Sequence, residues 1–239
     1  MEHTNSLVDY SGFRPSLLTT ERFRHWLMPL YWIVFGLAFY LTERAFTPTR
    51  WHVMHCSLDD VIPFCEWFVI PYVFWFVYLL GIHAYTFFFD VAASKKLMTF
   101  IMITYSAALV LFLVFPTAQE LRPAVFPRDN ALCRFMGHFY QMDTSTNVCP
   151  SLHVVGSMAV LFAAWDTPRF QTRKWKIAFG AVTFLICIST VFLKQHSVVD
   201  VIVGLLFSYA GYRLVYRGGL ERIAAALARQ REYFQRIYG

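Results

Sequence analysis

Six mostly apolar stretches separated by polar segments constrain this chain more than any other feature of its sequence. A membrane-spanning helix needs about twenty predominantly apolar residues, and most of the six come close to that length. The weakest of them, residues 150–165, is short and begins with polar residues. The pattern predicts an all-α fold, an integral membrane bundle of six transmembrane helices. The stretches are residues 26–42, 67–89, 97–115, 150–165, 177–193 and 201–212, the last extending to 216 past Arg213.

The composition supports a membrane environment. Of the 239 residues, 57% are hydrophobic and only 15% are charged, whereas a soluble domain is about half apolar and a quarter charged. Aromatic residues make up 19% of the chain, which suits lipid-facing surfaces and interfacial belts. We therefore expect one membrane domain over residues 1–239 and no soluble body.

The distribution of basic residues predicts the topology. If the six stretches cross alternately, 15 of the 21 Lys and Arg residues lie on the side that holds both termini. The positive-inside rule places that side in the cytoplasm. We expect a cytoplasmic segment over residues 1–25, a six-helix core over 26–216 and a cytoplasmic amphipathic tail over 217–239. The loops after the first, third and fifth helices are then extracytoplasmic.

The tail has a helical pattern with apolar residues near one face. This pattern is compatible with an interfacial helix and equally with a solvated helical tail. The apolar residues are Leu220, Ile223, Leu227, Phe234 and Tyr238.

Polar residues at the edges of apolar stretches are costly to keep and are the first candidates for function. Three such clusters fall on the predicted outer side. They are Arg122-Pro123, Cys149-Pro150-Ser151-Leu152-His153, and the segment from Ser189 to Asp200.

His196 and Asp200 are spaced four residues apart at the predicted start of a helix. Side chains at this spacing lie on one face, with Cβ atoms about 6 Å apart. A carboxylate there accepts the imidazole N–H and leaves the other ring nitrogen free, as a nucleophile or base requires. In the alternative interpretation His196 ends a loop and Asp200 only caps the helix.

Taken together, the clusters resemble the type 2 phosphatidic acid phosphatase family of membrane lipid phosphate phosphatases. Its pattern is K-x6-R-P, then P-S-G-H, then S-R-x5-H-x3-D. This sequence supplies, in the same order and over about half of the chain, Arg122-Pro123, Pro150-Ser151-Leu152-His153 and Ser189-x6-His196-x3-Asp200.

The resemblance implies a set of roles. His196 attacks phosphorus to give a phosphohistidine and Asp200 orients it, while His153 protonates the leaving alkoxide and then activates water or an alcohol. The scheme requires neither a metal nor another cofactor. The phosphoryl oxygens are held by Arg122, Ser151, Lys194 and the backbone N–H groups at Leu152.

The sequence departs from the family pattern at three positions. Phe115 stands in place of the motif Lys, Leu152 in place of Gly and Thr190 in place of Arg. Lys194, two residues before His196, is a candidate replacement for a missing cation. The P-S-L-H version and the missing arginine also look like the inositol phosphorylceramide synthase branch, and sphingomyelin synthases likewise rely on a His, His, Asp set.

The expected function is hydrolysis of a lipid phosphate or pyrophosphate at the outer face of the membrane. The alternative is a lipid phosphotransferase with the same catalytic residues, and a transporter is a remote third reading. The expected partners are the lipid phosphate substrate and membrane lipids, and not nucleic acid.

Two further features are weaker signals. The segment with His52, His55 and Cys56 has an H-x-x-H spacing in a loop, which is little evidence for a metal site. Cys133 and Cys149 fall in one outer loop, where they form a disulfide or, in the preferred interpretation, remain two free thiols.

Overall fold

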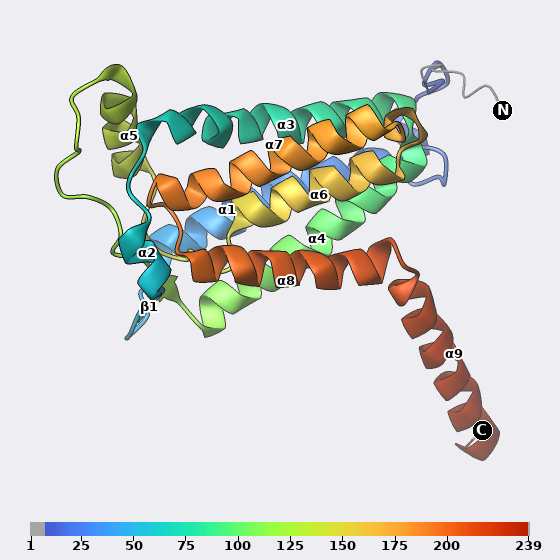
Figure 1. Ribbon diagram of the computed structural model, residues 1–239. Coiled ribbons are helices and arrows are strands. Elements are labelled where there is room, and N and C mark those ends of the chain that lie inside the picture. Colours follow the sequence, from blue (N-terminus) through green and yellow to red (C-terminus); the bar gives the residue numbers. More distant parts are fainter. Residues whose placement is uncertain (1–7, 239) are drawn as a thin grey trace.

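The computed structural model describes residues 8–238, without the side chains of residues 231–234 and 236–238. The long helices lie side by side in one bundle, and the longer connections between them gather at one end (Figure 1). The predicted all-α bundle is therefore confirmed in its helical character. In chain order the α-helices are α1 (Tyr31–Ala45), α2 (Ser57–Val61), α3 (Val69–Phe89), α4 (Val91–Val114), α5 (Ala131–Met142), α6 (Leu152–Asp166), α7 (Arg173–Phe192), α8 (Val198–Val215) and α9 (Gly219–Tyr238).

Short elements extend or connect these helices. The 3-10 helices η2 (Arg24–Leu30) and η3 (Glu66–Phe68) lead directly into α1 and α3. Pro29, which lacks a backbone N–H, lies inside η2, and this is where the first apolar stretch changes from 3-10 to α geometry. The remaining elements are η1 (Pro15–Leu17), η4 (Pro168–Phe170), β1 (His52–Val53) and β2 (Thr117–Ala118).

Within the described residues, five helical segments are long and apolar enough to cross a membrane, one fewer than predicted. The predicted span that does not reach this length is residues 150–165, which corresponds to α6 and has only 15 helical residues. It is the central helix, packed against α3, α4, α7 and α8. Most of its residues are buried by those neighbours, so α6 makes little contact with the surroundings and its length is not dictated by them.

Polar N-caps explain why two helices begin before their apolar stretches. Asp90 accepts a hydrogen bond from the Ala93 N–H and starts α4 ahead of Lys95 and Lys96. Ser197 starts α8 in the same way, with its side chain accepting from Val199 N–H. A side-chain oxygen at this position satisfies a backbone donor that the helix itself leaves free.

The two ends of the bundle differ. At one end, here called the loop end, lie α2, α5, β1 and β2, whereas α9 projects away from the opposite end (Figure 1). α5 was not predicted and follows Asn130, whose side chain caps it. In α9, Leu220, Ile223 and Leu227 are exposed. The predicted placement of Phe234 and Tyr238 on the same face lies outside the described side chains.

Backbone pairing ties three loop-end connections together. β1 and β2 form a parallel pair with His52 opposite Thr117, and Ala118 forms a bridge with Thr146. The Cys149 N–H also donates to the Thr117 hydroxyl at 3.0 Å. The segments after α1, α4 and α5 are thus held against each other, directly before α6 begins.

Candidate active site

His153 and His196 come together at the loop end of the bundle. His153 is the second residue of α6, and His196 lies in the connection between α7 and α8. Their ring centroids are 6.1 Å apart, with the ring planes inclined by 62°. Both rings line one cavity of about 280 Å³, so a single ligand in that cavity reaches both.

Asp200 lies behind His196. Its Oδ2 atom is 3.4 Å from Nδ1 of His196, and its side chain is fully buried. The same oxygen accepts the Ser197 N–H at 2.9 Å. Asp200 thus takes part in the cap of α8 and lies close to the imidazole, although Nδ1 of His196 has no hydrogen-bond partner among the described residues. With the proton on Nδ1 facing the carboxylate, the free lone pair of His196 is on Nε2.

The backbone of the α7–α8 connection fixes the direction of His196. α7 ends where Lys194 adopts a left-handed conformation with φ of 53°. The N–H groups of Gln195 and His196 then both donate to the carbonyl of Thr190. Thr190, which replaces the arginine of the family pattern, thus contributes its backbone to the turn.

Lys194 has other partners than the expected phosphate. Its ammonium donates to the backbone carbonyls of Asp59 and Ile62, and Lys194 is not among the residues that line the cavity. These bonds attach α2 to the α7–α8 connection. Burial lowers the pKa of Lys194, although Asp59 and Asp60 oppose that change.

Arg122 is also occupied by protein groups. Nη1 donates to the carbonyls of Tyr140 and Asp143, at 3.0 and 2.9 Å. Nη2 donates to the Thr144 carbonyl at 2.9 Å and to the Gln195 side-chain oxygen at 2.7 Å. Arg122 is absent from the cavity lining. The guanidinium therefore holds the segment after α5 against the His196 connection.

Ser151 and Leu152 form the start of α6. Ser151 is buried and its hydroxyl caps the helix by accepting the Val154 N–H, while its own N–H donates to the Asp200 carbonyl at 3.2 Å. Leu152 lines the cavity. The backbone N–H groups of a first helical turn have no acceptor within the helix and favour an anion.

Aromatic rings hold His153 in place. Its ring stacks on Tyr72 with centroids 4.4 Å apart and lies 4.5 Å from the ring of Trp75. The next turn of α6 carries Gly156, where a Cβ atom would lie 2.7 Å from the Tyr105 hydroxyl and 2.9 Å from Trp75. This close approach requires glycine at position 156.

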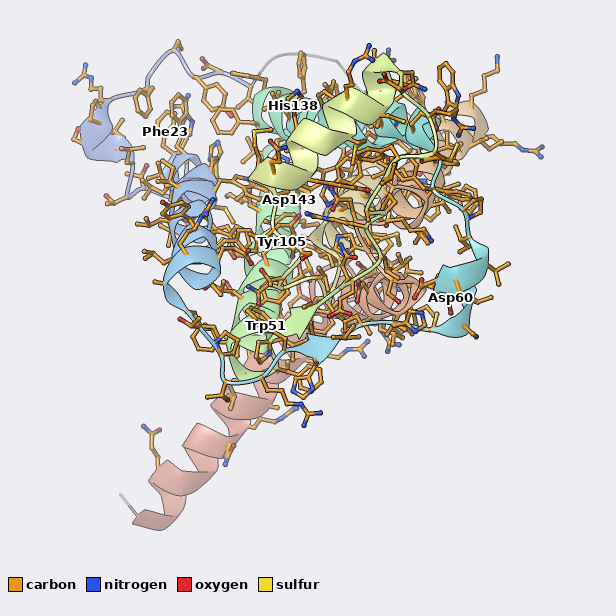
Figure 2. The ribbon with its side chains drawn as sticks, turned by 90° about the vertical axis from the view of Figure 1, so that its left-hand side faces the viewer. Phe23, Trp51, Asp60, Tyr105, His138 and Asp143 are labelled. Carbon is orange, nitrogen blue, oxygen red and sulfur yellow. The ribbon has the colours of Figure 1, made fainter. Side chains whose placement is uncertain are left out.

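The cavity has an aromatic wall and a polar wall. Trp32, Phe35 and Phe39 of α1, with Tyr72, Trp75 and Tyr105, form the aromatic wall. In the end-on view of Figure 2, Asp143 and Tyr105 lie near the middle of the bundle and Asp60 lies at its edge. The polar wall is formed by Asp143, Thr144, Thr146, Asn147 and Gln195.

Sequence patterns did not single out the residues of this polar wall. Glu43, at the end of α1, accepts hydrogen bonds from Thr144, Thr146 and Asn147. Burial raises the pKa of Asp143, and the charges of Arg122 and His196 counteract that rise. A run of polar residues between α5 and the P-S-L-H motif was the available signal.

Asp59 is another residue whose role the sequence did not reveal. Its carboxylate accepts from the Ser197 hydroxyl at 2.6 Å and from the Val198 N–H at 2.9 Å. Burial raises the pKa of Asp59, but hydrogen bonds from Ser197, Val198 and Cys56 outweigh it, so the pKa lies below its ordinary value. Asp59 thus caps α8 from α2.

Other predicted features lie away from the histidine pair. His52 stacks on Phe115, the replacement for the motif lysine, with centroids 3.9 Å apart. His55 pairs with Asp60 at 2.8 Å. In the described part of the chain no group of three or more His, Cys, Asp or Glu side chains could hold a metal ion.

All five cysteines are free thiols, including Cys133 and Cys149, which are both buried. Burial, together with the neighbouring Asp200 carboxylate, raises the pKa of Cys149 to about 12. The Cys149 thiol is therefore protonated at neutral pH.

A larger groove of about 880 Å³ runs along α3, α5 and α7. It is lined by apolar side chains such as Trp67, Phe74 and Phe135 and contains no ionisable group. It belongs to the exposed apolar surface of the bundle, whereas His153, His196 and Asp143 line the smaller cavity.

Comparison with known proteins gives one match. The family model described as PAP2 superfamily matches residues 95–223. This range is more than half of the chain and contains Arg122, His153, His196 and Asp200. The comparisons with curated proteins and with solved structures give no match.

Proposed function

This chain belongs to the PAP2 superfamily, and from that premise we propose that it hydrolyses a phosphate ester of a membrane lipid through a phosphohistidine intermediate. Members of the superfamily are phosphoesterases or related phosphotransferases that act on lipid phosphates in membranes. The observation that carries the proposal is the placement of His153 and His196 in one cavity, with centroids 6.1 Å apart and Asp200 behind His196.

In the first step, Nε2 of His196 attacks phosphorus and the P–O bond to the lipid alkoxide breaks. Asp200 faces Nδ1 of His196 and stabilises the positive charge that develops on the ring. His153 lies on the other side of the cavity and gives a proton to the leaving alkoxide. The lipid alcohol leaves and the phosphoryl group remains on His196.

In the second step, His153 takes a proton from a water molecule, whose oxygen attacks phosphorus. The P–N bond to His196 breaks and phosphate is released, so the enzyme returns to its starting state. The first turn of α6 supplies the backbone N–H of Leu152 for the phosphoryl oxygens, since the Ser151 N–H already donates to the Asp200 carbonyl. Donors already oriented toward the developing charge provide much of the stabilisation in phosphoryl transfer.

The proposal includes six membrane crossings, by α1, α3, α4, α6, α7 and α8. The short helix α6 counts as a crossing because its neighbours shield it on all sides. The excess of basic residues places both termini in the cytoplasm and the histidine pair on the extracytoplasmic side.

A second candidate function is transfer of the phosphoryl-containing group to an alcohol. The polar wall favours it, because Asp143 and Asn147 place hydrogen-bond acceptors in the cavity, where a hydroxyl group can bind. The catalytic residues are the same in both reactions. Product analysis with labelled lipid distinguishes them, since hydrolysis gives free phosphate from a monoester or the phosphorylated headgroup from a diester, and transfer gives a new phospholipid.

The test uses purified full-length protein in mixed micelles with phosphatidic acid, lysophosphatidic acid, phosphatidylglycerol phosphate, phosphatidylglycerol and undecaprenyl pyrophosphate. His196→Ala and His153→Ala should abolish turnover while the fold remains intact. His138→Ala is the matched control, because His138 is exposed on α5 at the same end of the bundle (Figure 2). Turnover by His196→Ala at the wild-type rate would refute the proposal.

A further inference from the structure

The orientation of the Gln195 side chain is determined by Arg122. The guanidinium donates to the Gln195 side-chain oxygen at 2.7 Å. A guanidinium has only donors, so the amide atom facing it is the oxygen and the NH₂ group lies on the other side. Gln195 is 3% exposed, and it lines the cavity.

The Gln195 NH₂ group has no hydrogen-bond partner in the described part of the chain. Nε2 of His153, which lines the same cavity, also has none. A buried donor without an acceptor is costly, so native proteins usually satisfy such groups. These atoms lie around the space that the proposed function assigns to a phosphoryl group, whose oxygens are strong acceptors.

Arg122 itself is poorly placed to bind that group. Four hydrogen bonds to protein oxygens occupy its two terminal nitrogens, and only its Nε has no partner among the described residues. Its charge is also balanced by the Asp143 carboxylate, which lies 3.6 Å from Nη2. Arg122 is not part of the cavity lining.

We infer that the Gln195 amide binds a phosphoryl oxygen of the substrate and that Arg122 is a positioning residue that orients this amide. The inference rests on the proposed function and deepens it, because it defines the charge of the phosphoryl group that the site accepts. In this site the neutral Gln195 amide stands at the position where a site for a dianionic phosphate would have a cationic side chain.

The charge of the cavity determines which phosphate ester fits. Among the described residues that line it there is no Lys or Arg, and the charge of the nearby Arg122 is balanced by Asp143. A phosphomonoester carries between one and two negative charges at neutral pH, whereas a phosphodiester carries one. The site therefore prefers a lipid phosphodiester to a lipid phosphomonoester.

The polar wall provides for the remainder of such a substrate. The Asn147 amide nitrogen donates to Glu43, which leaves its Oδ1 atom without a partner among the described residues. Asn147 and Asp143 both line the cavity. These acceptors match a headgroup that carries hydroxyl groups, which a phosphomonoester lacks.

The experiment compares phosphatidic acid and phosphatidylglycerol with identical acyl chains in mixed micelles. Attack of His196 on phosphorus expels diacylglycerol from both lipids, and His153 protonates it, so one product reports both reactions. We expect kcat/KM for phosphatidylglycerol to exceed that for phosphatidic acid by about 10-fold or more. An equal or higher value for phosphatidic acid, or no release from phosphatidylglycerol, overturns the inference.

Substitutions at Gln195 test the amide directly. Gln195→Glu keeps an acceptor for Arg122 but loses the NH₂ group, and should lower kcat/KM for phosphatidylglycerol about 100-fold, as loss of one such donor does in other enzymes. Gln195→Lys should shift the preference toward phosphatidic acid. The matched control is Gln171→Glu, an exposed position at the opposite end of the bundle, where kcat/KM should not change.

A double-mutant cycle tests the role of Arg122. If Arg122 acts through Gln195, Arg122→Ala lowers kcat/KM in the wild type but changes it little when Gln195→Ala is already present. If Arg122 binds phosphate directly, the two losses multiply and the inference is overturned. Arg122→Lys, which retains the charge, replaces Arg122→Ala in the cycle if the latter does not fold.

The His196→Ala variant separates the two proposals. If it still releases diacylglycerol at the wild-type rate, the proposed function fails. If it is inactive while Gln195→Glu retains wild-type kcat/KM for phosphatidylglycerol, only the inference about Gln195 and Arg122 fails.

Discussion

Asp59 and Ser197, which are 138 residues apart in the sequence, are joined by a hydrogen bond of 2.6 Å between the carboxylate and the hydroxyl. Ser197 directly follows His196, and Asp59 also accepts the Val198 N–H at the start of α8. The loop that carries α2 thus holds the backbone next to the proposed nucleophile. A residue outside the motif segments therefore positions His196.

Replacement of Asp59 should affect stability and turnover together. Asp59→Ala removes three buried or part-buried hydrogen bonds at α2 and α8, which should cost about 1–3 kcal/mol. It should also lower kcat, because the His196 backbone loses its support. Thermal unfolding and lipid turnover check this, with Asp60→Ala as the control, since Asp60 is largely exposed and pairs only with His55 among the described side chains.

The contribution of Asp59 to stability should depend on pH. The pKa of Asp59 lies below its ordinary value of 3.8 in the folded protein. A carboxyl group with a lowered pKa stabilises the fold at pH values above 3.8, and this stabilisation is lost as the pH falls through the folded-state pKa. The difference in Tm between the wild type and Asp59→Asn should be full at pH 7 and shrink below pH 3.8. A difference that does not vary with pH would contradict the ionic role.

Gly156→Ala should disturb the support of His153. The new methyl group would lie 2.7 Å from the Tyr105 hydroxyl and 2.9 Å from Trp75, so these side chains would have to move. We expect a loss of stability of about 1–3 kcal/mol and a lower kcat. Gly81→Ala in α3 is the matched control, because nothing lies within 4 Å of the added carbon and alanine favours a helix.

The proposed topology predicts which segments are accessible from each side of the membrane. Val125, in the loop before α5, is 83% exposed at the loop end. An epitope inserted after Val125 should bind antibody on intact cells, whereas an epitope after Gly239 should bind only after the membrane is permeabilised. The reverse pattern would place His153 and His196 on the cytoplasmic side.

The helices of the bundle could be predicted from the sequence because burial in lipid or among other helices requires long apolar segments. The order of the motifs also brought together His153, His196 and Asp200, since α6 and α8 both begin at the same end of the bundle. The spacing predicted that His196 and Asp200 lie close together, but His196 stands in the connection just before α8 and not on a face of that helix.

The partners of Lys194 and Arg122 depend on long-range packing and could not be predicted. Lys194 binds carbonyls of the α2 loop, and Arg122 binds the segment after α5 and Gln195. The side chains of Lys194 and Arg122 are long and flexible, so their sequence positions near the motifs do not determine which groups they contact. α5 was missed for a related reason, because its amphipathic sequence lacks the length of an apolar span.

By itself, the sequence indicated the membrane class and the approximate spans, because these follow from local patterns of apolar residues, whereas the three residues proposed for catalysis came from the resemblance of their motifs to those of the family. Only the tertiary structure decided which groups line the cavity of the histidine pair and which groups support the backbone beside it. Asp59, Asn147 and Gln195 come from separate connections, and their contacts arise only after the helices have packed and the loop-end segments have paired.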